Sequence, residues 1–525
     1  MTTSASGLKH ALLAGIFAAA LALIGCGGGG GGGGPPVMTA PILSLSATSL
    51  TFAAQANGTT SAAGVITVSN TGNATLTVSG VTIGGVDAAM FAASTTCASV
   101  AAGSSCTISV TYAPTALGGA SATLSIAANV TGSPVNVTLA GTGSAASGAN
   151  TVTGLDDAGP AALTNAALNV LYVSVKICAP GSTTNCQTVD HIQVDTGSFG
   201  LRVLSEVLNA PLAAALATRA TAGPGNALLE CTQFADGYSW GPIKTADVTI
   251  GTKVAAALPI QVIGDPAYPA ATLAPAKCLQ GPGGATEEDT VDQFGANGII
   301  GIGYFLQDCG AFCPADGSVY SDCTATTCNG YAALLTEQVP NPVGAFASDN
   351  NGVIIQLPDT PSTGGTNVAG TLIFGIGTAA NNALAASATV YTVSATTGSF
   401  SATYAGTTMP DSVVDSGSNG SYFPNVNSLL TACASPNTSF YCPTLDTAVT
   451  AQITGANNAT ASVTLPVNNL NEIGATTTAF PGLGGTISGL QTTFDFGLPF
   501  FFGRTVYVAF EGTTLGGEVA PAIAF

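Results

Sequence analysis

Two four-residue motifs of one type, 220 residues apart, contain the side chains best suited to chemistry. Two carboxylates that share one site cannot both ionise easily, so they hold one proton between them. One can then act as general base on a water while the other acts as general acid toward a carbonyl. The motifs predict a catalytic pair, Asp195 and Asp415, supported by the residues that follow each aspartate: Thr196, Gly197, Ser198, Ser416, Gly417 and Ser418.

Strand-like runs must deliver both aspartates. Residues 189–194 lead into the first motif and residues 409–414 into the second, and both runs contain valine. The glycine of each motif allows a tight turn after the strand, and the hydroxyls can hydrogen-bond to the carboxylates or across an interface. Two such copies predict two lobes of similar plan.

The composition favours many short strands and excludes one class of partner. Of 525 residues, 46% are apolar, only 7% are charged, and 67 are glycine. The net charge is −19, and the few lysines and arginines are scattered, so no basic stripe predicts nucleic-acid binding. Short apolar runs separated by Gly, Ser, Thr and Asn predict an all-β protein.

The N-terminus has the features of an export signal. Lys9 precedes an apolar run, residues 11–23, that is short for a membrane span, and Leu23-Ile24-Gly25-Cys26 resembles a bacterial lipobox. The alternatives are an ordinary cleaved signal peptide or a membrane anchor. We expect a signal peptide over 1–25, lipidation of Cys26, and a Gly/Pro tether over 26–42.

Thirteen cysteines leave an even set once Cys26 is set aside. In an exported chain such a set predicts disulfides and an oxidising compartment. Zinc is the competing reading for the four-cysteine cluster, but the spacings are irregular and no histidine lies nearby, so we predict no metal. The pairing within the cluster stays open. The candidates are Cys97 with Cys106, Cys178 with Cys186, Cys231 with Cys278, Cys433 with Cys442, and the cluster Cys309, Cys313, Cys323 and Cys328.

Residues 43–143 predict an immunoglobulin-like β-sandwich, because six or seven short alternating strands fall within about a hundred residues. The strings Val68-Ser69-Asn70-Thr71-Gly72-Asn73 and Tyr112-Ala113-Pro114 resemble the bacterial choice-of-anchor and Hydin-type domains. That resemblance implies a spacer or binding module. Residues 144–151 then form a linker.

From about residue 165 to the end, the chain resembles the pepsin-like aspartic peptidases. The resemblance implies a bilobal pepsin-like double-ψ β-barrel domain, with lobes at 152–380 and 381–525. A narrower resemblance is to bacterial lipoproteins of unknown function that carry a pepsin-like repeat. The landmarks stand in the family's order: 195–203 and 415–424 as catalytic loops, 234–241 and 246–251 as the flap hairpin and next strand, 297–303 as a hydrophobic-hydrophobic-Gly element, 370–375 as the strand entering the second lobe, and 494–502 with 505–510 as the closing element and final strands.

Several positions depart from the family's pattern. Phe234 stands where the flap tyrosine is usual, Arg202 where an aromatic residue is typical, and Phe199 and Asn419 replace small hydroxyl residues. The flap and substrate candidates are therefore Phe234, Gly237, Tyr238 and Trp240. Trp240 is either a flap-tip contact or a half-buried strand residue. His191 is expected to be structural, which disfavours a Ser-His-Asp site.

These observations predict a lipid-anchored aspartic endopeptidase of the bacterial cell envelope, located at the outer membrane or facing the periplasm. A water activated between Asp195 and Asp415 would hydrolyse a peptide or protein substrate, without a cofactor. We expect a monomer whose other partner is the membrane. The rival is a catalytically silent surface lipoprotein that keeps the fold for binding or structure.

Overall fold

The structure, a computed structural model, describes residues 39–525 except 57–58, 117, 145–147, 149, 282, 285 and 487–490. The predicted signal peptide, the lipidation site Cys26 and most of the tether lie outside the described residues. Within them, no helix is both long and apolar enough to cross a membrane.

The first domain is a sandwich of two sheets, as expected from the alternating strands. Each sheet places alternate side chains in a shared core, and the other side chains face outward. One sheet runs β1 (Leu43–Leu45), β4 (Gly64–Asn70), β8 (Ser105–Tyr112) and β6 (Phe91–Thr95). The other runs β2 (Ser49–Thr51), β10 (Val135–Ser144), β9 (Gly118–Ala128), β5 (Leu76–Gly84) and β7 (Ser99–Val100), with β3 (Gln55–Ala56) also paired to β10.

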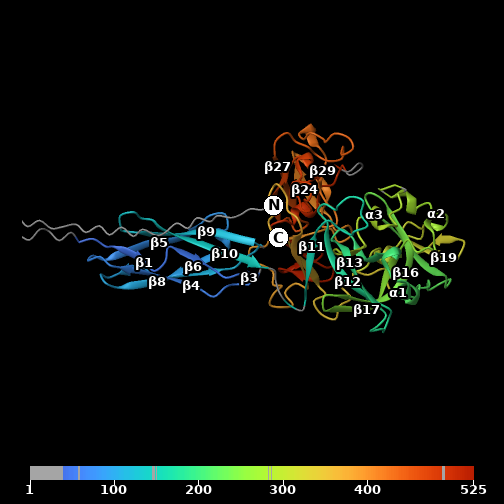
Figure 1. Ribbon diagram of the computed structural model, residues 1–525, viewed down its shortest axis with the longest axis horizontal. Coiled ribbons are helices and arrows are strands. Elements are labelled where there is room, and N and C mark those ends of the chain that lie inside the picture. The colour runs from blue at the N-terminus through green and yellow to red at the C-terminus, as the bar shows by residue number, and fades with distance from the viewer. Residues whose placement is uncertain are drawn as a thin grey trace, which may run out of the picture.

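Three aromatic side chains lie together in the sandwich core. The rings of Phe52, Phe91 and Tyr112 contact one another, with centroids between 4.8 and 6.0 Å apart. A disulfide joins Cys97 to Cys106, which lies in β8. The sandwich extends to one side of the larger body (Figure 1), and the Thr505 hydroxyl of the body donates to a carbonyl of the sandwich at 2.8 Å.

One long sheet runs through the first lobe and into the centre of the body. Among the described residues its strands are, in spatial order, β20 (Cys328–Gly330), β19 (Tyr320–Cys323), β15 (Ala227–Gln233), β16 (Tyr238–Ile250), β17 (Lys253–Ile263), β14 (Phe199–Leu204), β18 (Gly298–Ile302), β13 (Cys186–Asp195), β12 (Leu171–Cys178), β11 (Thr151–Asp156), β22 (Val368–Phe374), β21 (Gly352–Gln356), β31 (Thr505–Ala509), β34 (Ala522–Ala524) and β23 (Val390–Thr392).

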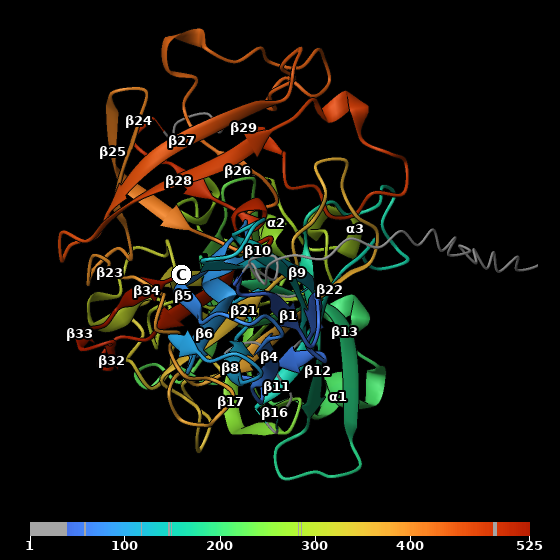
Figure 2. The ribbon, with the colours of Figure 1, turned by 90° about the vertical axis from the view of Figure 1, so that its left-hand side faces the viewer.

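A second sheet forms the other lobe, separate from the strands around β13 and β16 in both views (Figures 1 and 2). Its order is β28 (Thr460–Val467), β27 (Thr447–Thr454), β24 (Phe400–Tyr404), β25 (Thr407–Val414), β30 (Asp495–Phe496), β26 (Ser421–Tyr422) and β29 (Gly484–Gly485). A small hairpin pairs β32 (Thr514–Leu515) with β33 (Glu518–Val519).

Helices are few and short in the described part of the chain. The α-helices are α1 (Ala210–Ala215), α2 (Ala270–Leu273) and α3 (Val291–Phe294). Single 3-10 turns lie at Ala88–Met90, Ser205–Val207, Cys278–Gln280, Gly310–Phe312, Val426–Ser428, Leu470–Glu472 and Leu498–Phe500.

The two lobes repeat one strand arrangement. In the first, β18 lies parallel to β13 and antiparallel to β14, and in the second, β30 lies parallel to β25 and antiparallel to β26. One continuous hydrophobic core spans both lobes. The protein is therefore all-β, with an immunoglobulin-like sandwich followed by a bilobal pepsin-like body. The division of the lobes at residue 380 stays a prediction.

Candidate active site

The two predicted aspartates meet between the lobes. Asp195 ends β13 and Asp415 directly follows β25, and their carboxyl groups are in hydrogen-bonding contact. In each loop the amide of the motif glycine donates to the aspartate Oδ1, at 2.6 Å for Asp195 and 2.7 Å for Asp415. The serine at the fourth position donates to Oδ2 of the same aspartate. Both carboxyl groups are thus fixed by equivalent donors.

Each motif glycine lies against the aspartate of the opposite lobe. A Cβ added at Gly197 would stand 2.6 Å from Cγ of Asp415, and one at Gly417 would stand 2.5 Å from Oδ1 of Asp195. Real Cβ atoms do not come so close to other heavy atoms. Only glycine at these positions lets the two carboxyl groups touch.

The second-position hydroxyls join the lobes. The Thr196 hydroxyl accepts from the Ser416 amide at 2.9 Å and donates to the Val414 carbonyl at 3.2 Å. The Ser416 hydroxyl accepts from the Thr196 amide at 3.2 Å and donates to the Val194 carbonyl at 2.8 Å. All four bonds are buried, so the relative position of the two aspartates is set by backbone as well as side chain.

Burial is the main cause that raises the pKa of Asp195 well above its usual range, and the charge of Asp415 adds to it. Asp195 is only 5% exposed. Two buried carboxyl groups in contact share one proton, so the pair can supply an acid and a base at one point.

A glycine beneath each loop allows a strand to pass under it. A Cβ at Gly301, in β18, would overlap the backbone of Phe199, and a Cβ at Gly497, just after β30, would overlap the carbonyl oxygen of Gly420. The backbone of each catalytic loop therefore rests directly on its hydrophobic-Gly element. This packing fixes the positions of Asp195 at the end of β13 and of Asp415 just after β25.

A third carboxyl group, which was not predicted as a site residue, lies beside the pair. Asp495, in β30, is 6% exposed, and its Oδ2 is 2.5 Å from the Ser418 hydroxyl. Burial, and next the charge of Asp415, raise the pKa of Asp495 well above its usual range. The alternation Phe-Asp-Phe over 494–496 was the signal, since it places the acid on the face opposite the two rings.

Two tyrosines, also missed from the sequence, contribute to the surroundings. Burial and the nearby charge of Asp415 raise the pKa of Tyr304, whose buried hydroxyl has no hydrogen-bond partner among the described residues. Burial and then the charge of Asp495 raise the pKa of Tyr422, and Asp236 contributes as well. Because Asp236 lies at the tip of the β15–β16 hairpin, this hairpin of the first lobe approaches the second lobe.

Two of the four flap candidates on this hairpin, Tyr238 and Trp240, have buried side chains. Trp240 is 1% exposed and donates from Nε1 to the Tyr268 carbonyl, and Tyr238 is also buried. Both are core residues of the hairpin, so Trp240 is neither a flap-tip contact nor half-buried, and Tyr238 does not replace the flap tyrosine. Phe234 is half-buried against Phe294, and buried Gly237 closes the turn by accepting from the Phe234 amide.

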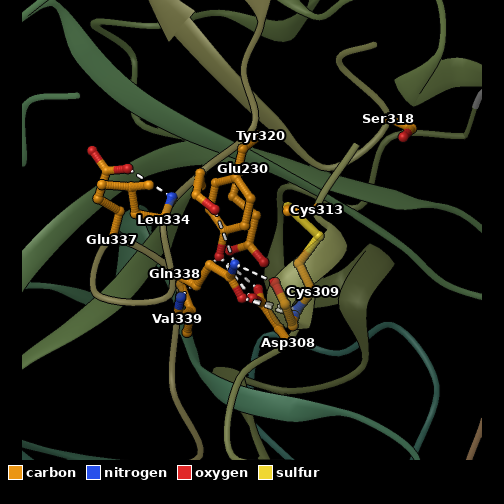
Figure 3. Close-up of a disulfide and its surroundings, with 12 residues drawn as sticks. Glu230, Asp308, Cys309, Cys313, Ser318, Tyr320, Leu334, Glu337, Gln338 and Val339 are labelled. Carbon is orange, nitrogen blue, oxygen red and sulfur yellow. Dashed lines mark hydrogen bonds between the residues drawn. A yellow bond between two sulfur atoms is a disulfide. The ribbon is translucent and has the colours of Figure 1, made fainter. Parts of the chain in front are cut away.

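Arg202 is 2% exposed and belongs to a buried ionic network. Its guanidinium bonds to Glu230 and lies 3.1 Å from Asp308. Figure 3 shows Glu230, Asp308 and Tyr320 grouped beside the Cys309–Cys313 disulfide. The Tyr320 hydroxyl donates to Asp308 at 2.7 Å, and burial raises the pKa of Asp308. The network braces the strand that follows the first catalytic loop.

The remaining predicted residues lie away from the pair or have structural partners. His191 faces Asp157 and Asp190 at 3.4 Å each, on the far part of β13. The four cysteines of the cluster form Cys309–Cys313 and Cys323–Cys328, and the four predicted couples elsewhere are all disulfides. Within the described ranges, no group of three or more His, Cys, Asp or Glu side chains could hold a metal ion.

Comparison with known proteins places the chain in a family. Residues 146–525 match the family described as "Protein of unknown function (DUF3443)". The chain belongs to this family. Ahead of the family region, residues 41–142 match the HYDIN/CFA65/VesB-like, Ig-like domain, in agreement with the sandwich.

Two solved structures are similar to this family member. One, an aspartic proteinase from Irpex lacteus, is 15% identical over 71% of this chain and 96% of its own, with a TM-score of 0.42. The other, a protein of unknown function from Porphyromonas gingivalis W83, is 18% identical over 20% of this chain and half of its own, with a TM-score of 0.18. No curated protein matches the chain in sequence.

Proposed function

We propose that residues 152–525 form an aspartic endopeptidase that acts as a monomer on peptide or protein substrates. The observation that carries this proposal is the contact between the Asp195 and Asp415 carboxyl groups, each held by a glycine amide and a serine hydroxyl. A buried carboxyl pair that shares a proton supplies an acid and a base at one point.

The reaction needs only a water and the two side chains. Asp415, as carboxylate, takes a proton from the water while the water oxygen bonds to the peptide carbonyl carbon. Asp195 gives its proton to the carbonyl oxygen, which leaves a neutral tetrahedral gem-diol. The C–N bond then breaks as the proton on Asp415 passes to the amide nitrogen and a gem-diol hydroxyl returns its proton to Asp195. The products are a carboxylic acid and an amine.

The rival proposal is a binding or structural protein in which Asp195 and Asp415 catalyse no reaction. The β15–β16 hairpin favours this rival, because Tyr238 and Trp240 are buried and Phe234 stands where the resembling peptidases usually have a tyrosine. A hairpin without that hydroxyl has one polar group fewer with which to position substrate. The two proposals differ in whether any peptide bond is cut.

The test is incubation of the purified full chain with an unfolded protein between about pH 3 and pH 7, the range in which carboxyl pairs work. Mass spectrometry identifies any cleaved bonds. Asp195→Asn and Asp415→Asn are run beside the wild type, and Asp411→Asn, an exposed acid on β25, is the matched control. We expect cleavage by wild type and control only. Cleavage that survives both pair variants, or no cleavage at any pH, would remove the peptidase proposal.

We further propose that Cys26 is lipidated and anchors the protein in the bacterial cell envelope, with the sandwich as a spacer. In support, the other twelve cysteines pair with one another in six disulfides and need no bond to Cys26. Disulfides also fit an exported chain. Labelling with a radioactive fatty acid should mark the wild type and not Cys26→Ser. Equal labelling, or none, would contradict lipidation.

A further inference from the structure

The further inference concerns Asp495 and its contact with the catalytic loop. β30 is only two residues long and lies between β25 and β26. Phe494 and Phe496 stack in the core, with ring centroids 4.3 Å apart, so the side chain between them points to the opposite face. There it reaches Ser418, while its second oxygen, Oδ1, is buried without a hydrogen-bond partner in the described part of the chain.

The first lobe has an isoleucine, Ile299, at the position equivalent to Asp495. In the parallel pairing of β13 and β18, Gln193, two residues before Asp195, lies opposite Ile299. In the pairing of β25 and β30, Val413, two residues before Asp415, lies opposite Asp495. The repeated strand arrangement therefore places an isoleucine and an aspartate at equivalent points. A buried acid where the other lobe has an aliphatic side chain is costly, because burial disfavours its charged form.

The two carboxyl groups that contact the Ser418 hydroxyl limit which of these three groups can donate a hydrogen bond. Its hydroxyl oxygen is 3.1 Å from Oδ2 of Asp415 and 2.5 Å from Oδ2 of Asp495. A hydroxyl has one hydrogen to donate and two lone pairs that accept, so it cannot donate to both carboxyl groups. The shorter contact lies at the short end of O–H···O hydrogen bonds. One carboxyl group must therefore donate to Ser418. Asp495 is the candidate, because it is buried, its Oδ1 has no hydrogen-bond partner and no cation contacts it among the described residues.

We propose that Asp495 is a protonated carboxylic acid that donates to Ser418, so that Ser418 donates to Asp415 and holds it as the carboxylate of the pair. The importance of this for catalysis rests on the proposed peptidase function, whereas the protonation of Asp495 does not. Asp495 is a positioning residue, because it acts on the reacting groups through Ser418.

The groups that face Asp495 agree with a neutral acid there. Asp415 and Asp195 approach from the two catalytic loops, Tyr422 lies opposite on β26, and no cation contacts Asp495 among the described residues. Burial is the largest cause that raises the pKa of Asp495, followed by the charge of Asp415. When Asp495 loses its proton at higher pH, a second negative charge enters the site and Ser418 has two acceptors competing for one hydrogen. Activity should then fall, so Asp495 sets the alkaline limit of the pH profile.

Two variants of the full chain test this assignment. Asp495→Asn keeps a donor toward Ser418 but cannot ionise, and Asp495→Ile carries the residue that the first lobe has at this point. Asp411→Asn is the control, since Asp411 is an exposed acid on the neighbouring strand β25. Circular dichroism checks that each variant is folded, and either variant alone is sufficient for the infrared test below.

Infrared difference spectra at neutral pH detect a protonated carboxyl group directly. We expect a carboxylic-acid C=O band that disappears in Asp495→Asn and in Asp495→Ile and persists in Asp411→Asn. This readout needs no activity, so an inactive wild type would remove the peptidase function and leave the protonation testable. A band unchanged in a folded Asp495 variant would overturn the proposal.

The pH profile of kcat/KM tests the role in the reaction. We expect Asp495→Asn to keep activity at acid pH and to move the alkaline limit up by about one pH unit or more. Asp495→Ile should lower kcat about tenfold with little change in KM. In this variant Ser418 loses the hydrogen bond donated by Asp495, so the hydrogen bond from Ser418 to Asp415 is less firmly oriented. An alkaline limit that stays in place in both variants would show that Asp495 is a structural residue only.

Discussion

Thr196 and Ser416 exchange hydrogen bonds across the lobe interface. Each hydroxyl accepts from the amide of the other residue and donates to the carbonyl that precedes the opposite aspartate. These four hydrogen bonds hold two backbone segments from different lobes in one fixed arrangement. That arrangement sets the relative position of Asp195 and Asp415, which directly precede Thr196 and Ser416.

Removal of one of these hydroxyls should destabilise the protein. Thr196→Ala leaves the buried amide of Ser416 without an acceptor, and we expect the free energy of unfolding to fall by about 1–3 kcal/mol. Thr196→Ser keeps the hydroxyl and should lose less. Thr464→Ala, an exposed threonine on β28, should stay within about 0.5 kcal/mol of wild type in the same denaturant titration. Equal stability of all three variants would contradict the cross-lobe role.

The contact of the two carboxyl groups depends on the motif glycines. Gly417→Ala inserts a Cβ at 2.5 Å from Oδ1 of Asp195 and forces the carboxyl groups apart. We expect peptidase activity to fall by about 100-fold or more, because catalysis is sensitive to misplacement by an ångström. Gly223→Ala, where an added Cβ meets nothing within 4 Å, is the control and should keep its activity. A fully active Gly417→Ala would mean that the carboxyl groups need not touch.

Asp156 should make the stability depend on pH. It is fully buried in β11, and burial raises its pKa to about 8. Because the folded pKa lies above the unfolded value, the native state binds the proton more tightly. Its contribution to stability is complete below about pH 4 and is lost as the pH rises toward about 8, at most about 6 kcal/mol.

Asp156→Asn removes this ionisation and should flatten that part of the curve. Denaturant unfolding at steps from about pH 4 to pH 8.5 measures the difference between wild type and variant. We expect the variant to gain on the wild type as the pH rises. A constant difference across the range would show that Asp156 does not titrate as described.

The buried guanidinium of Arg202 should be essential to the first lobe. Arg202→Met leaves the carboxyl groups of Glu230 and Asp308 buried together without a cation, and we expect a loss of about 3–5 kcal/mol in the free energy of unfolding near neutral pH. Adding Glu230→Gln should restore part of it. Arg219→Met, at a half-buried arginine without an ion-pair partner in the described ranges, should cost less. If the two arginine variants lose equal stability, the network has no special role.

Much of the fold could be predicted because its signals are local. Alternating runs indicate strands, and the catalytic loops must contain an acid, a glycine and hydroxyls in a fixed order. The four disulfides outside the cluster follow cysteine couples that the sequence already shows. The pairing within the cluster could not be predicted, because four closely spaced cysteines allow three connectivities. The β19–β20 hairpin decides it by placing Cys323 opposite Cys328.

The site was predicted less completely than the fold, because the groups around the carboxyl pair depend on which face of its strand each side chain occupies. Trp240 has a polar group that suited a flap, but its Nε1 finds a backbone carbonyl inside the hairpin. The alternation of Asp495 with Phe494 and Phe496 indicates that the acid faces away from the two rings, but not what lies on that face. Its proximity to Asp415, 80 residues earlier in the chain, follows from the parallel pairing of β25 and β30, which no local pattern specifies.

The most direct test of the central claim is kcat/KM on one peptide that the wild type cleaves, measured for Asp195→Asn and Asp415→Asn. Because the two carboxyl groups act as one unit, each substitution alone should lower kcat/KM by about 1,000-fold or more. The Asp411→Asn control should remain near the wild-type value. If either pair variant keeps kcat/KM within about tenfold of wild type, the carboxyl pair is not the catalytic centre.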